Sequence, residues 1–334
     1  MRRLSDGASH RHGVGIASVR FADKVRGQSR RKNRTTPMCA KSLLLLNRKS
    51  AVRSDVRSIV KSLQKEFELD VWVPWSGKQT RKLIKQAIKG GTTRVIGAGG
   101  DGTVNAVANA ILRMGVADSV DMGLVPLGTA NDFARAFGDD GSDPESSLRR
   151  AITGESKAID LGRINGEVFV NVASGGYGAM ITATTDVEIK RRLGGIAYTL
   201  TGISRLSELA PTKAKVTLDD GEVRDLDLTI MAIGNSRFAG GGFDVTPLAD
   251  VSDGKLDFAM LAPPGLVEGQ PDLISIFERD DPTEAFMFRA QFEKALIETN
   301  TPYHINLDGE PMVDTRFEVD ILPGALRLVP PGKG

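Results

Sequence analysis

Short apolar segments alternate with amphipathic ones between residues 43 and 137, and this alternation restricts the fold more than any other feature. Residues 43–46, 69–73, 94–96 and 122–125 have the composition of buried strands. Spacings of three and four between apolar residues predict helices at about residues 56–67, 83–88, 104–114 and 130–137. Because alternating strands and helices form a mostly parallel sheet covered on both faces, the first half is expected to be an α/β domain.

The pattern changes after about Gly162. The expected strands are then residues 167–173, 215–218, 226–234, 255–261, 304–307 and 317–322, and the expected helices are residues 180–209 and about 283–296. Asp219-Asp220-Gly221 has the residues of a hairpin turn. Many strands and few helices predict a second, largely antiparallel β-rich domain.

A glycine-rich loop follows the third expected strand and precedes a helix. Gly97, Gly99 and Gly102 match the pattern G-x-G-x-x-G, which alone is a weak indication of a dinucleotide site. Asp101 argues against that site, because a carboxylate repels phosphate unless a cation lies between them. Glycine backbone together with an Asp favours a Mg-nucleotide. A tight turn in which Asp101 caps the helix is the alternative, and the P-loop pattern G-x-x-x-x-G-K-[ST] does not occur in the sequence.

Rare residues exclude several classes of site. A single cysteine, Cys39, excludes an internal disulfide and a cysteine zinc site. Of three histidines, His10 and His12 precede the first expected strand, which leaves His304 for the folded body as a structural residue or a lone base. This argues against a multi-histidine metal site and a Ser-His-Asp hydrolase. Carboxylates and glycine loops remain as candidates for chemistry.

Residues 1–37 differ in charge from the rest of the chain. They hold ten Lys or Arg and two acidic residues, whereas the remainder has 34 basic and 40 acidic residues and no nucleic-acid signature. Such a basic leader is typical of an organelle transit peptide. A disordered basic tail and a start codon placed too early, with translation from Met38, are the alternatives. No apolar run approaches the roughly 18 residues of a membrane span.

Several motifs together resemble the catalytic superfamily of diacylglycerol kinases, most closely the bacterial YegS-type lipid kinases. They are GGDGTVN (99–105), PLGTANDFARAFG (126–138), AIDLG (158–162), NVASGGYGAMI (171–181), GNSRFAGGGF (234–243), ADVSDGKLDFAML (249–261) and, near the end, INLDGEP and ILPGALRLVPP. The resemblance runs from about Lys41 to Pro330. Each motif is short, but their common order over this length is specific.

The resemblance implies an enzyme that transfers the γ-phosphoryl group of ATP to a lipid hydroxyl with Mg²⁺. It implies a nucleotide-binding α/β domain at residues 38–162, with a mostly parallel sheet as in NAD kinases and diacylglycerol kinases. An antiparallel, sandwich-like domain for lipid and metal follows at residues 163–322, and residues 323–334 return to the first domain. The site is then expected between the two domains.

The resemblance also implies which residues contact ATP. They are Asn47, Ser50, Gly99, Gly100, Asp101, Gly102, Thr103, Val104, Asn105 and Thr129. Backbone N–H groups and short hydroxyl side chains suit phosphate oxygens. For the turn at residues 126–129 the alternative is simple helix initiation. Asp101 is expected to act on the catalytic Mg²⁺ directly or through water.

A second Mg²⁺ site is implied for residues 249–256. The matching positions supply the side chain of Asp253 and the main-chain oxygens of Asp250 and Lys255, and Asp160 is expected to join this acidic network. A carbonyl ligand does not depend on the side chain, so a lysine is acceptable there. The alternative is an ordinary Asp253-Gly254 turn between two strands.

The same resemblance makes Glu310 the general base. A carboxylate suits this role when a metal lowers the barrier to attack by an alcohol. Asp308 is the alternative base or a metal residue, and a straight strand would put it on the same face as Glu310. Residues 308–310 also have the composition of a plain hairpin turn.

Two positions depart from the family pattern. Ala106 occupies a position where the family often has Glu, and Pro74 one where close relatives have a nucleotide-contacting Thr. The second change removes one hydroxyl contact, worth about 1 kcal/mol. Gly175, Gly176 and Tyr177 correspond to the acceptor-lipid side of the family's site.

The sequence therefore predicts a lipid kinase that is cytoplasmic and peripheral to a membrane, without a nucleic-acid partner or a transmembrane segment. Organelle import follows if the leader is a transit peptide. An NAD kinase-like enzyme and a catalytically silent lipid-binding relative are the alternatives. NDFAR after Gly128-Thr129 favours the lipid kinase, and the set Asp101, Asp253, Asp308 and Glu310 argues against a silent relative. The acceptor remains open between diacylglycerol, phosphatidylglycerol, a sphingoid base and an isoprenoid alcohol.

Overall fold

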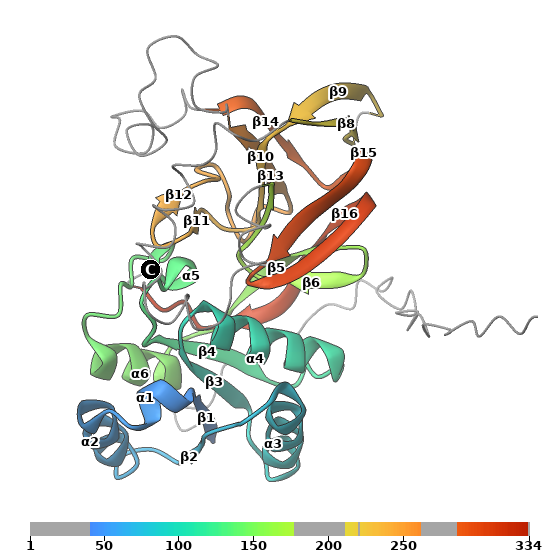
Figure 1. The fold of residues 1–334 in the computed structure, drawn as a ribbon. Coiled ribbons are helices and arrows are strands. Elements are labelled where there is room, and N and C mark those ends of the chain that lie inside the picture. The colour runs from blue at the N-terminus through green and yellow to red at the C-terminus, as the bar shows by residue number, and fades with distance from the viewer. Residues whose placement is uncertain (1–40, 177–210, 220, 262–285, 333–334) are drawn as a thin grey trace, which may run out of the picture. The chain divides into compact units, whose positions relative to one another are not determined.

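The computed structural model describes residues 41–176, 211–219, 221–261 and 286–332, which lie in one unit comprising residues 36–334 (Figure 1). The helix expected over residues 180–209 and the side chain of Tyr177 lie outside the described residues. Among the helices in the described part of the chain, none combines the length and the apolar character needed to cross a bilayer.

The first half contains four parallel strands in the order β2-β1-β3-β4, with helices in the connections. The elements are β1 (Ser42–Leu46), α1 (Arg48–Ala51), α2 (Ser54–Leu63), β2 (Leu69–Trp72), α3 (Gly77–Lys89), β3 (Arg94–Gly99), α4 (Asp101–Arg113), β4 (Asp121–Pro126), α5 (Asp132–Arg135) and α6 (Pro144–Thr153). The parallel α/β arrangement predicted from the alternating pattern is confirmed.

Strand β1 has a continuous run of leucines because both of its faces are buried. Leu43 and Leu45 pack with residues of α3 and α4, whereas Leu44 and Leu46 pack with residues of α2 and α6 (Figure 1). All four leucines are buried because helices cover both faces of the sheet. A leucine that is fully buried contributes about 1.5–3 kcal/mol relative to an exposed one, so this strand anchors both layers of the core.

The second half is β-rich and mainly antiparallel, as expected. Its strands are β5 (Lys157–Ile164), β6 (Glu167–Phe169), β7 (Val172–Gly176), β8 (Thr212–Thr217), β9 (Val223–Leu228), β10 (Ile230–Gly234), β11 (Phe238–Ala239), β12 (Phe243–Asp244), β13 (Leu256–Leu261), β14 (Phe286–Phe292), β15 (Lys294–Leu307) and β16 (Glu310–Leu328). The expected single strands at 167–173 and 226–234 are each divided into two strands.

The last strand connects the two halves of the sheet. β16 pairs antiparallel with β15 and β5, and at its end Leu328 pairs in parallel with Met122 of β4. Asp121 of β4 accepts a hydrogen bond from Arg327 Nε at 2.8 Å and pairs with buried Arg94 at 3.4 Å. Because one carboxylate serves both guanidinium groups, the end of the chain is held electrostatically as well as by backbone pairing.

The helix expected at residues 283–296 is wrong: residues 286–292 form β14 and residues 294–296 begin β15, while residues 283–285 lie outside the described residues. Ala, Glu, Lys and Leu suggested a helix, but Phe288, Ala290 and Phe292 recur with the period of two that a strand requires. Strand β13 supplies the partner backbone, with Phe258 opposite Ala290. Pairing with a distant strand overrides local helix propensity here. Helix α6 was not predicted, and α5 is shorter than the expected 130–137.

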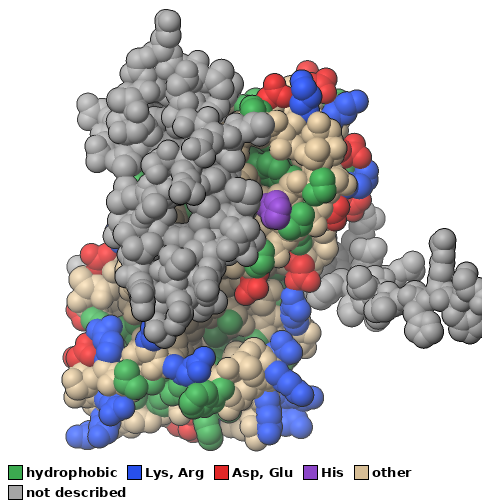
Figure 2. All heavy atoms as spheres, in the orientation of Figure 1, with side chains coloured by type: hydrophobic (Ala, Val, Ile, Leu, Met, Phe, Trp, Pro, Cys, Tyr) green, Lys and Arg blue, Asp and Glu red, His purple; other side chains and the backbone are tan. Residues whose placement is uncertain are grey.

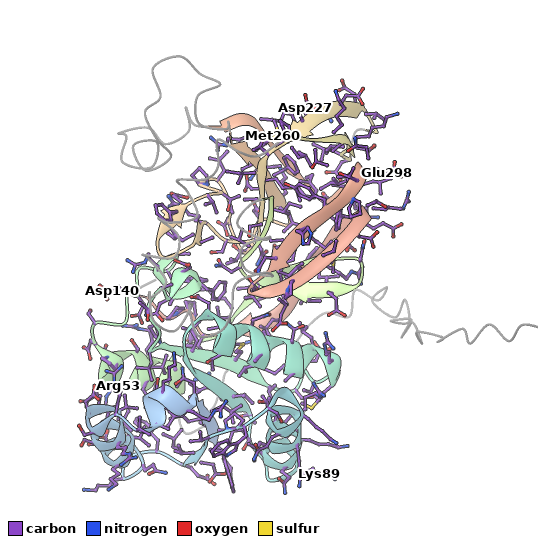
Figure 3. The ribbon with its side chains drawn as sticks, viewed as in Figure 1. Arg53, Lys89, Asp140, Asp227, Met260 and Glu298 are labelled. Carbon is purple, nitrogen blue, oxygen red and sulfur yellow. The ribbon has the colours of Figure 1, made fainter. Side chains whose placement is uncertain are left out.

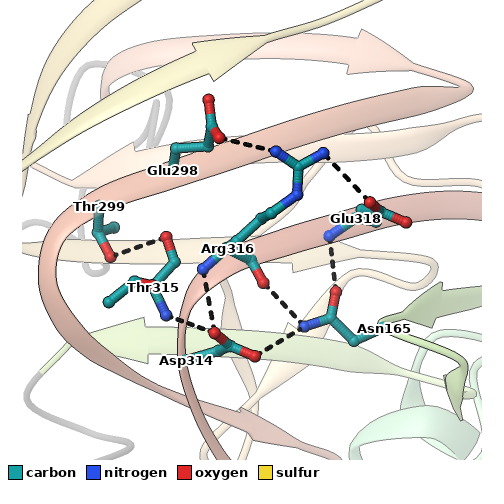
Figure 4. A network of polar contacts seen from close by, with 7 residues as sticks. All are labelled: Asn165, Glu298, Thr299, Asp314, Thr315, Arg316 and Glu318. Atoms are coloured by element: carbon teal, nitrogen blue, oxygen red, sulfur yellow. Dashed lines mark hydrogen bonds and ion pairs between the residues drawn. The ribbon is translucent and has the colours of Figure 1, made fainter. Parts of the chain in front are cut away.

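A polar network joins the turn between β5 and β6 to the β15–β16 hairpin (Figure 4). Asn165 has a positive φ of 48° and donates from Nδ2 to the carbonyl of Arg316 at 2.8 Å. Its Oδ1 accepts the N–H of Glu318 at 2.7 Å. Arg316 pairs with Glu298 across the hairpin at 2.8 Å. These bonds fix the register of the hairpin whose turn contains Asp308.

Candidate active site

The carboxyl ends of β1, β3 and β4 meet at one edge of the parallel sheet. The N–H of Asn47, just after β1, donates to the carbonyl of Ala98 in β3 at 3.0 Å. The N–H of Leu127, just after β4, donates to the carbonyl of Gly99 at 2.9 Å. Ligands of open α/β sheets bind at this edge, so the three loops define the place to look for a nucleotide site.

Glycine is required where these loops touch. A Cβ on Gly99 would lie 2.2 Å from Thr103 Oγ1 and 2.7 Å from Asn47 Nδ2. A Cβ on Gly128 would lie 2.5 Å from the Cα of Gly100. The glycine loop and the turn after β4 therefore approach backbone to backbone, and the motifs GGDGT and PLGT form one continuous surface.

The residues expected to contact ATP differ in burial and in the hydrogen bonds that they already make. Asn47 caps α1, since its Oδ1 accepts the N–H of Ser50 at 2.7 Å, and the Ser50 side chain is buried. Asn105 is buried and accepts a bond from Asn109 at 2.6 Å, and Val104 lies in the core. Val104 therefore has only its main chain to offer a ligand.

Gly102 and Thr129 are exposed at the same edge. Gly102 lies in the first turn of α4, and a Cβ placed there meets no atom within 4 Å beyond its own turn. Open space beside a glycine at a helix N-terminus is where a phosphate approaches backbone N–H groups most closely. Asn131 holds the Thr129 turn, because its Oδ1 accepts the N–H of Gly128 at 2.8 Å.

Asp101 does not cap its own helix. Gly100 is the N-cap of α4, and Asp101 Oδ1 accepts the N–H of Phe133, in α5, at 3.0 Å. The capping alternative is therefore wrong. Burial raises the pKa of both Asp132 and Asp308, and the charge of Asp101 adds a smaller part. Asp101 therefore lies beside Asp132, the residue before Phe133, and is near enough to Asp308 for their charges to interact.

Asp132 was not among the expected site residues. It is buried, and burial, followed by the nearby charge of Asp101, raises its pKa. Its Oδ2 accepts the N–H of Gly241 at 3.0 Å, whereas its Oδ1 is buried without a hydrogen-bond partner. Asp132 is part of the NDFAR motif, but its burial depends on the loop around Gly241, more than 100 residues away. No local pattern contained that information.

The two carboxylates at the β15–β16 turn, Asp308 and Glu310, lie in different surroundings. Asp308 and Gly309 both have positive φ, so the chain reverses between Asp308 and Glu310, and the expected common strand face is wrong. Both carboxylate oxygens of Asp308 accept bonds from the backbone N–H groups of Val170, Asn171 and Val172, at 2.6–3.2 Å. Burial outweighs these bonds and raises its pKa to about 6. Glu310 begins β16 and is exposed.

The segment from Asp250 to Lys255 forms a turn before β13. Asp253 Oδ1 accepts the N–H of Lys255 at 2.9 Å, and Asp160 Oδ2 accepts the N–H of Gly254 at 2.8 Å. Burial and the charges of Asp250 and Asp160 raise the pKa of Asp253. Burial, together with Asp253, raises the pKa of Asp257 to about 6. An excess of negative charge therefore surrounds this turn.

No group of three or more His, Cys, Asp and Glu side chains arranged as a metal cage is found within the described ranges. Mg²⁺ usually binds through one or two carboxylates together with waters and substrate phosphates, so such a cage is not required for it.

Gly175 and Gly176 of β7 are constrained by packing. A Cβ on Gly175 would lie 2.5 Å from Tyr303 Cε1, and one on Gly176 would lie 2.0 Å from the carbonyl of Thr229. Gly176 also has a φ of 92°. These contacts explain both glycines without a ligand, so the expected role near an acceptor lipid stays a prediction.

Comparison with known proteins shows the family to which the chain belongs. The diacylglycerol kinase catalytic domain matches residues 41–164, and the YegS C-terminal NAD kinase beta sandwich-like domain matches residues 171–330. A "Probable lipid kinase YegS-like" from Alcanivorax borkumensis is 37% identical over 299 residues, covering 88% of this chain and 98% of that protein. A "Probable lipid kinase YegS" from Salmonella paratyphi A is 35% identical and covers 87% and 96%.

A solved structure of a diacylglycerol kinase from Bacillus anthracis str. Sterne shares the fold, with a TM-score of 0.68 and 24% identity over 86% of this chain and 96% of that one. Two consecutive family matches that together span most of the chain define a two-part kinase with a diacylglycerol kinase catalytic domain. The chain belongs to the family of YegS-like lipid kinases.

Proposed function

We propose that the protein is an ATP-dependent, Mg²⁺-requiring kinase that transfers the γ-phosphoryl group of ATP to a hydroxyl of a lipid. The observation that carries the proposal is the hydrogen bond that holds Asp101 against α5, next to the buried Asp132, beside an open glycine loop at the carboxyl edge of the sheet. Neighbouring carboxylates beside a glycine loop at a helix N-terminus favour a bound cation. The relatives named as lipid kinases supply the acceptor class.

The residues present fit Mg²⁺. Asp132 has a buried carboxylate oxygen without a partner, next to the charge of Asp101, and hard oxygen ligands are those that Mg²⁺ prefers. Asp101 and Asp132 are therefore the residues that would hold the catalytic ion. When bound, the ion neutralises charge on the phosphates. The protein's own contribution is to position ATP through the loop from Gly99 to Asn105 and to keep Asp101 fixed against α5.

Glu310 serves as the general base in this proposal. Asp308 has both oxygens engaged by the backbone of residues 170–172, so it is better suited to positioning that segment than to accepting a proton. Glu310 lies two residues further along the chain and is exposed. A hydroxyl proton of the lipid is taken up by the Glu310 carboxylate as phosphoryl transfer proceeds.

Substitution of Gly102 by Ala separates stability from nucleotide binding. An alanine in a helix is more stable than a glycine by about 0.5–1 kcal/mol, and Gly102 has room for a Cβ, so the melting temperature is expected to rise. The methyl group occupies the space through which phosphate approaches, so ATP affinity is expected to fall about tenfold or more. Differential scanning fluorimetry and calorimetric titration measure the two effects.

Gly77→Ala is the matched control for Gly102→Ala, because Gly77 also begins a helix and a Cβ there would meet no atom closer than Arg81 Nη1 at 4.0 Å. It is expected to raise stability and leave ATP affinity unchanged. If Gly102→Ala binds ATP as tightly as the unchanged protein, phosphate does not approach this loop.

The second proposed Mg²⁺ site uses Asp253 with the main-chain oxygens of Asp250 and Lys255. An ion that binds only the folded state stabilises it by mass action, so Mg²⁺ without nucleotide should raise the melting temperature. Asp253→Ala is expected to remove most of that rise, whereas Asp227→Ala, an exposed residue of β9, should keep it. An unchanged response in Asp253→Ala would make this segment an ordinary turn.

The acceptor class is tested by supplying total bacterial lipid extract or NAD with ATP and Mg²⁺ and identifying the phosphorylated product by mass spectrometry. A phosphorylated lipid and unmodified NAD are expected. Phosphorylation of NAD would assign the chain to the NAD kinase alternative, and no product with either acceptor would favour a catalytically silent relative.

A further inference from the structure

We propose that the outer face of α3, together with Trp72, Trp75 and Val52, is a docking surface for anionic lipid bilayers. The surface is called the α3 face below. The inference rests on the proposed function for the identity of its partner, because a kinase that acts on membrane lipid has to hold its active site against a bilayer. The contacts and charges that carry it are independent of the catalytic carboxylates.

The tryptophans are the first observation. The chain has only two tryptophans, three residues apart, and they are 54% and 70% exposed at Trp72 and Trp75. Val52, at the end of α1, is 70% exposed. In water these two exposed rings leave apolar area unburied. At the headgroup level of a bilayer the same rings are stabilised, because tryptophan is amphipathic.

The position of Trp75 is fixed rather than incidental. Ser76 caps α3, and Gln79 Oε1 accepts the backbone N–H of Trp75 at 2.7 Å. The guanidinium of Arg48 lies 5.1 Å from the centre of the Trp75 ring. Arg48 directly follows Asn47, whose side chain meets the glycine loop, so the α3 face lies beside the proposed nucleotide site.

Charge is the second observation. Helix α3 carries five basic residues and no acidic one. Lys78, Lys82, Lys85 and Lys89 follow at spacings of four, three and four, which aligns them in one stripe, while Leu83 and Ile84 face the core. Within the described part of the chain no ion pair involves these lysines. Figure 3 labels Lys89 at the end of this helix.

The acidic residues of neighbouring elements do not cancel this charge, because they are paired. Asp55 pairs with Arg53 and Glu66 with Arg149, and Lys41 pairs with both Glu68 and Asp70. Figure 2 shows apolar side chains among Lys and Arg side chains at the end of the molecule where Figure 1 places α1, α2 and α3. Unpaired lysines beside exposed tryptophans complement a negatively charged bilayer and have no comparable attraction to a neutral one.

Vesicle binding of the full chain without nucleotide tests the surface. With vesicles that contain phosphatidylglycerol, tryptophan emission is expected to shift to the blue and to be quenched by brominated acyl chains, because both tryptophans lie on the α3 face. Vesicles of phosphatidylcholine alone should bind weakly. The triple variant Lys78→Gln, Lys82→Gln, Lys85→Gln is expected to lose about 100-fold in affinity, at about fivefold for each basic side chain.

The matched control is Lys213→Gln, Lys215→Gln, Lys294→Gln, which removes the same charge from exposed positions of β8 and β15. It should bind like the unchanged protein. Equal loss in both triple variants, or no change in tryptophan emission on binding, overturns the proposal. A single-stranded oligonucleotide that binds more tightly than the vesicles and gives the same emission change assigns the face to nucleic acid instead.

A kinase assay on a monomeric short-chain lipid separates this proposal from the function. The α3 triple variant should keep full turnover on this monomeric lipid, because its lysines are not among the proposed catalytic or nucleotide-contacting residues. If the unchanged protein binds anionic vesicles but phosphorylates no lipid, the docking surface stands and the proposed function is wrong. If it phosphorylates lipid but does not bind vesicles through α3, the proposed function stands and the docking surface is wrong.

Discussion

Asp101→Asn is expected to lower lipid phosphorylation by at least about 10³-fold while the protein stays folded, because removal of a charge that stabilises phosphoryl transfer is among the most damaging changes to such a site. The amide keeps an oxygen that accepts the N–H of Phe133, so the contact between α4 and α5 is preserved. Removal of the negative charge also relieves its repulsion of Asp132 and Asp308. Thermal stability should therefore be retained or raised, and turnover and melting temperature measure the two effects.

Asp143→Asn is the control for Asp101→Asn. Asp143 also lies at a helix N-terminus and accepts one backbone N–H, from Ser146 at 3.0 Å. It should leave turnover unchanged. Near-normal activity of Asp101→Asn would mean that the aspartate only connects α4 to α5, and the metal–phosphate role would be wrong.

Glu310→Gln is expected to lower kcat by about 10²–10⁴-fold, with ATP affinity and melting temperature nearly constant, because the amide keeps the shape but does not accept a proton. Asp308→Asn is expected to behave differently. Its amide group would face backbone N–H donors that now bond to the carboxylate, and each unsatisfied donor costs about 1–3 kcal/mol. Asp308→Asn should therefore lower the melting temperature as well as turnover.

Together, Glu310→Gln and Asp308→Asn show which of the two carboxylates is the general base. If Glu310→Gln keeps normal turnover, while Asp308→Asn loses turnover without a change in melting temperature, Asp308 is the base. If both variants are active and stable, residues 308–310 form only a hairpin turn. Steady-state kinetics on the identified lipid and thermal melts of the same preparations distinguish these cases.

The local patterns of the sequence predicted the parallel half well. Strand β1 is a run of apolar residues because both faces are covered, and the spacing of three and four around Val60 and Leu63 follows one side of α2. Both signals lie within one element. The helix prediction at 283–296 was wrong because the strand character of residues 286–292 depends on pairing with β13, which lies some 30 residues earlier in the chain.

The candidate site shows the same limit. The motif around Asp101 was recognised because the glycines and the aspartate are consecutive. Asp132 was missed because its burial requires the distant Gly241. The backbone partners of Asp308 in residues 170–172 could not be predicted either, because they lie more than 130 residues away in the chain. Residue types and spacing indicate which chemistry is available, whereas the three-dimensional contacts determine which carboxylate is free to perform it.

In the proposed reaction the γ-phosphoryl group of ATP passes to a lipid. Its most direct test follows radioactive phosphate into the organic phase, with ATP labelled at the γ position in one reaction and at the α position in another, in the presence of lipid and Mg²⁺. We expect lipid label from γ-labelled ATP only, and almost none with Asp101→Asn. Label from α-labelled ATP, or equal transfer by Asp101→Asn, would contradict it.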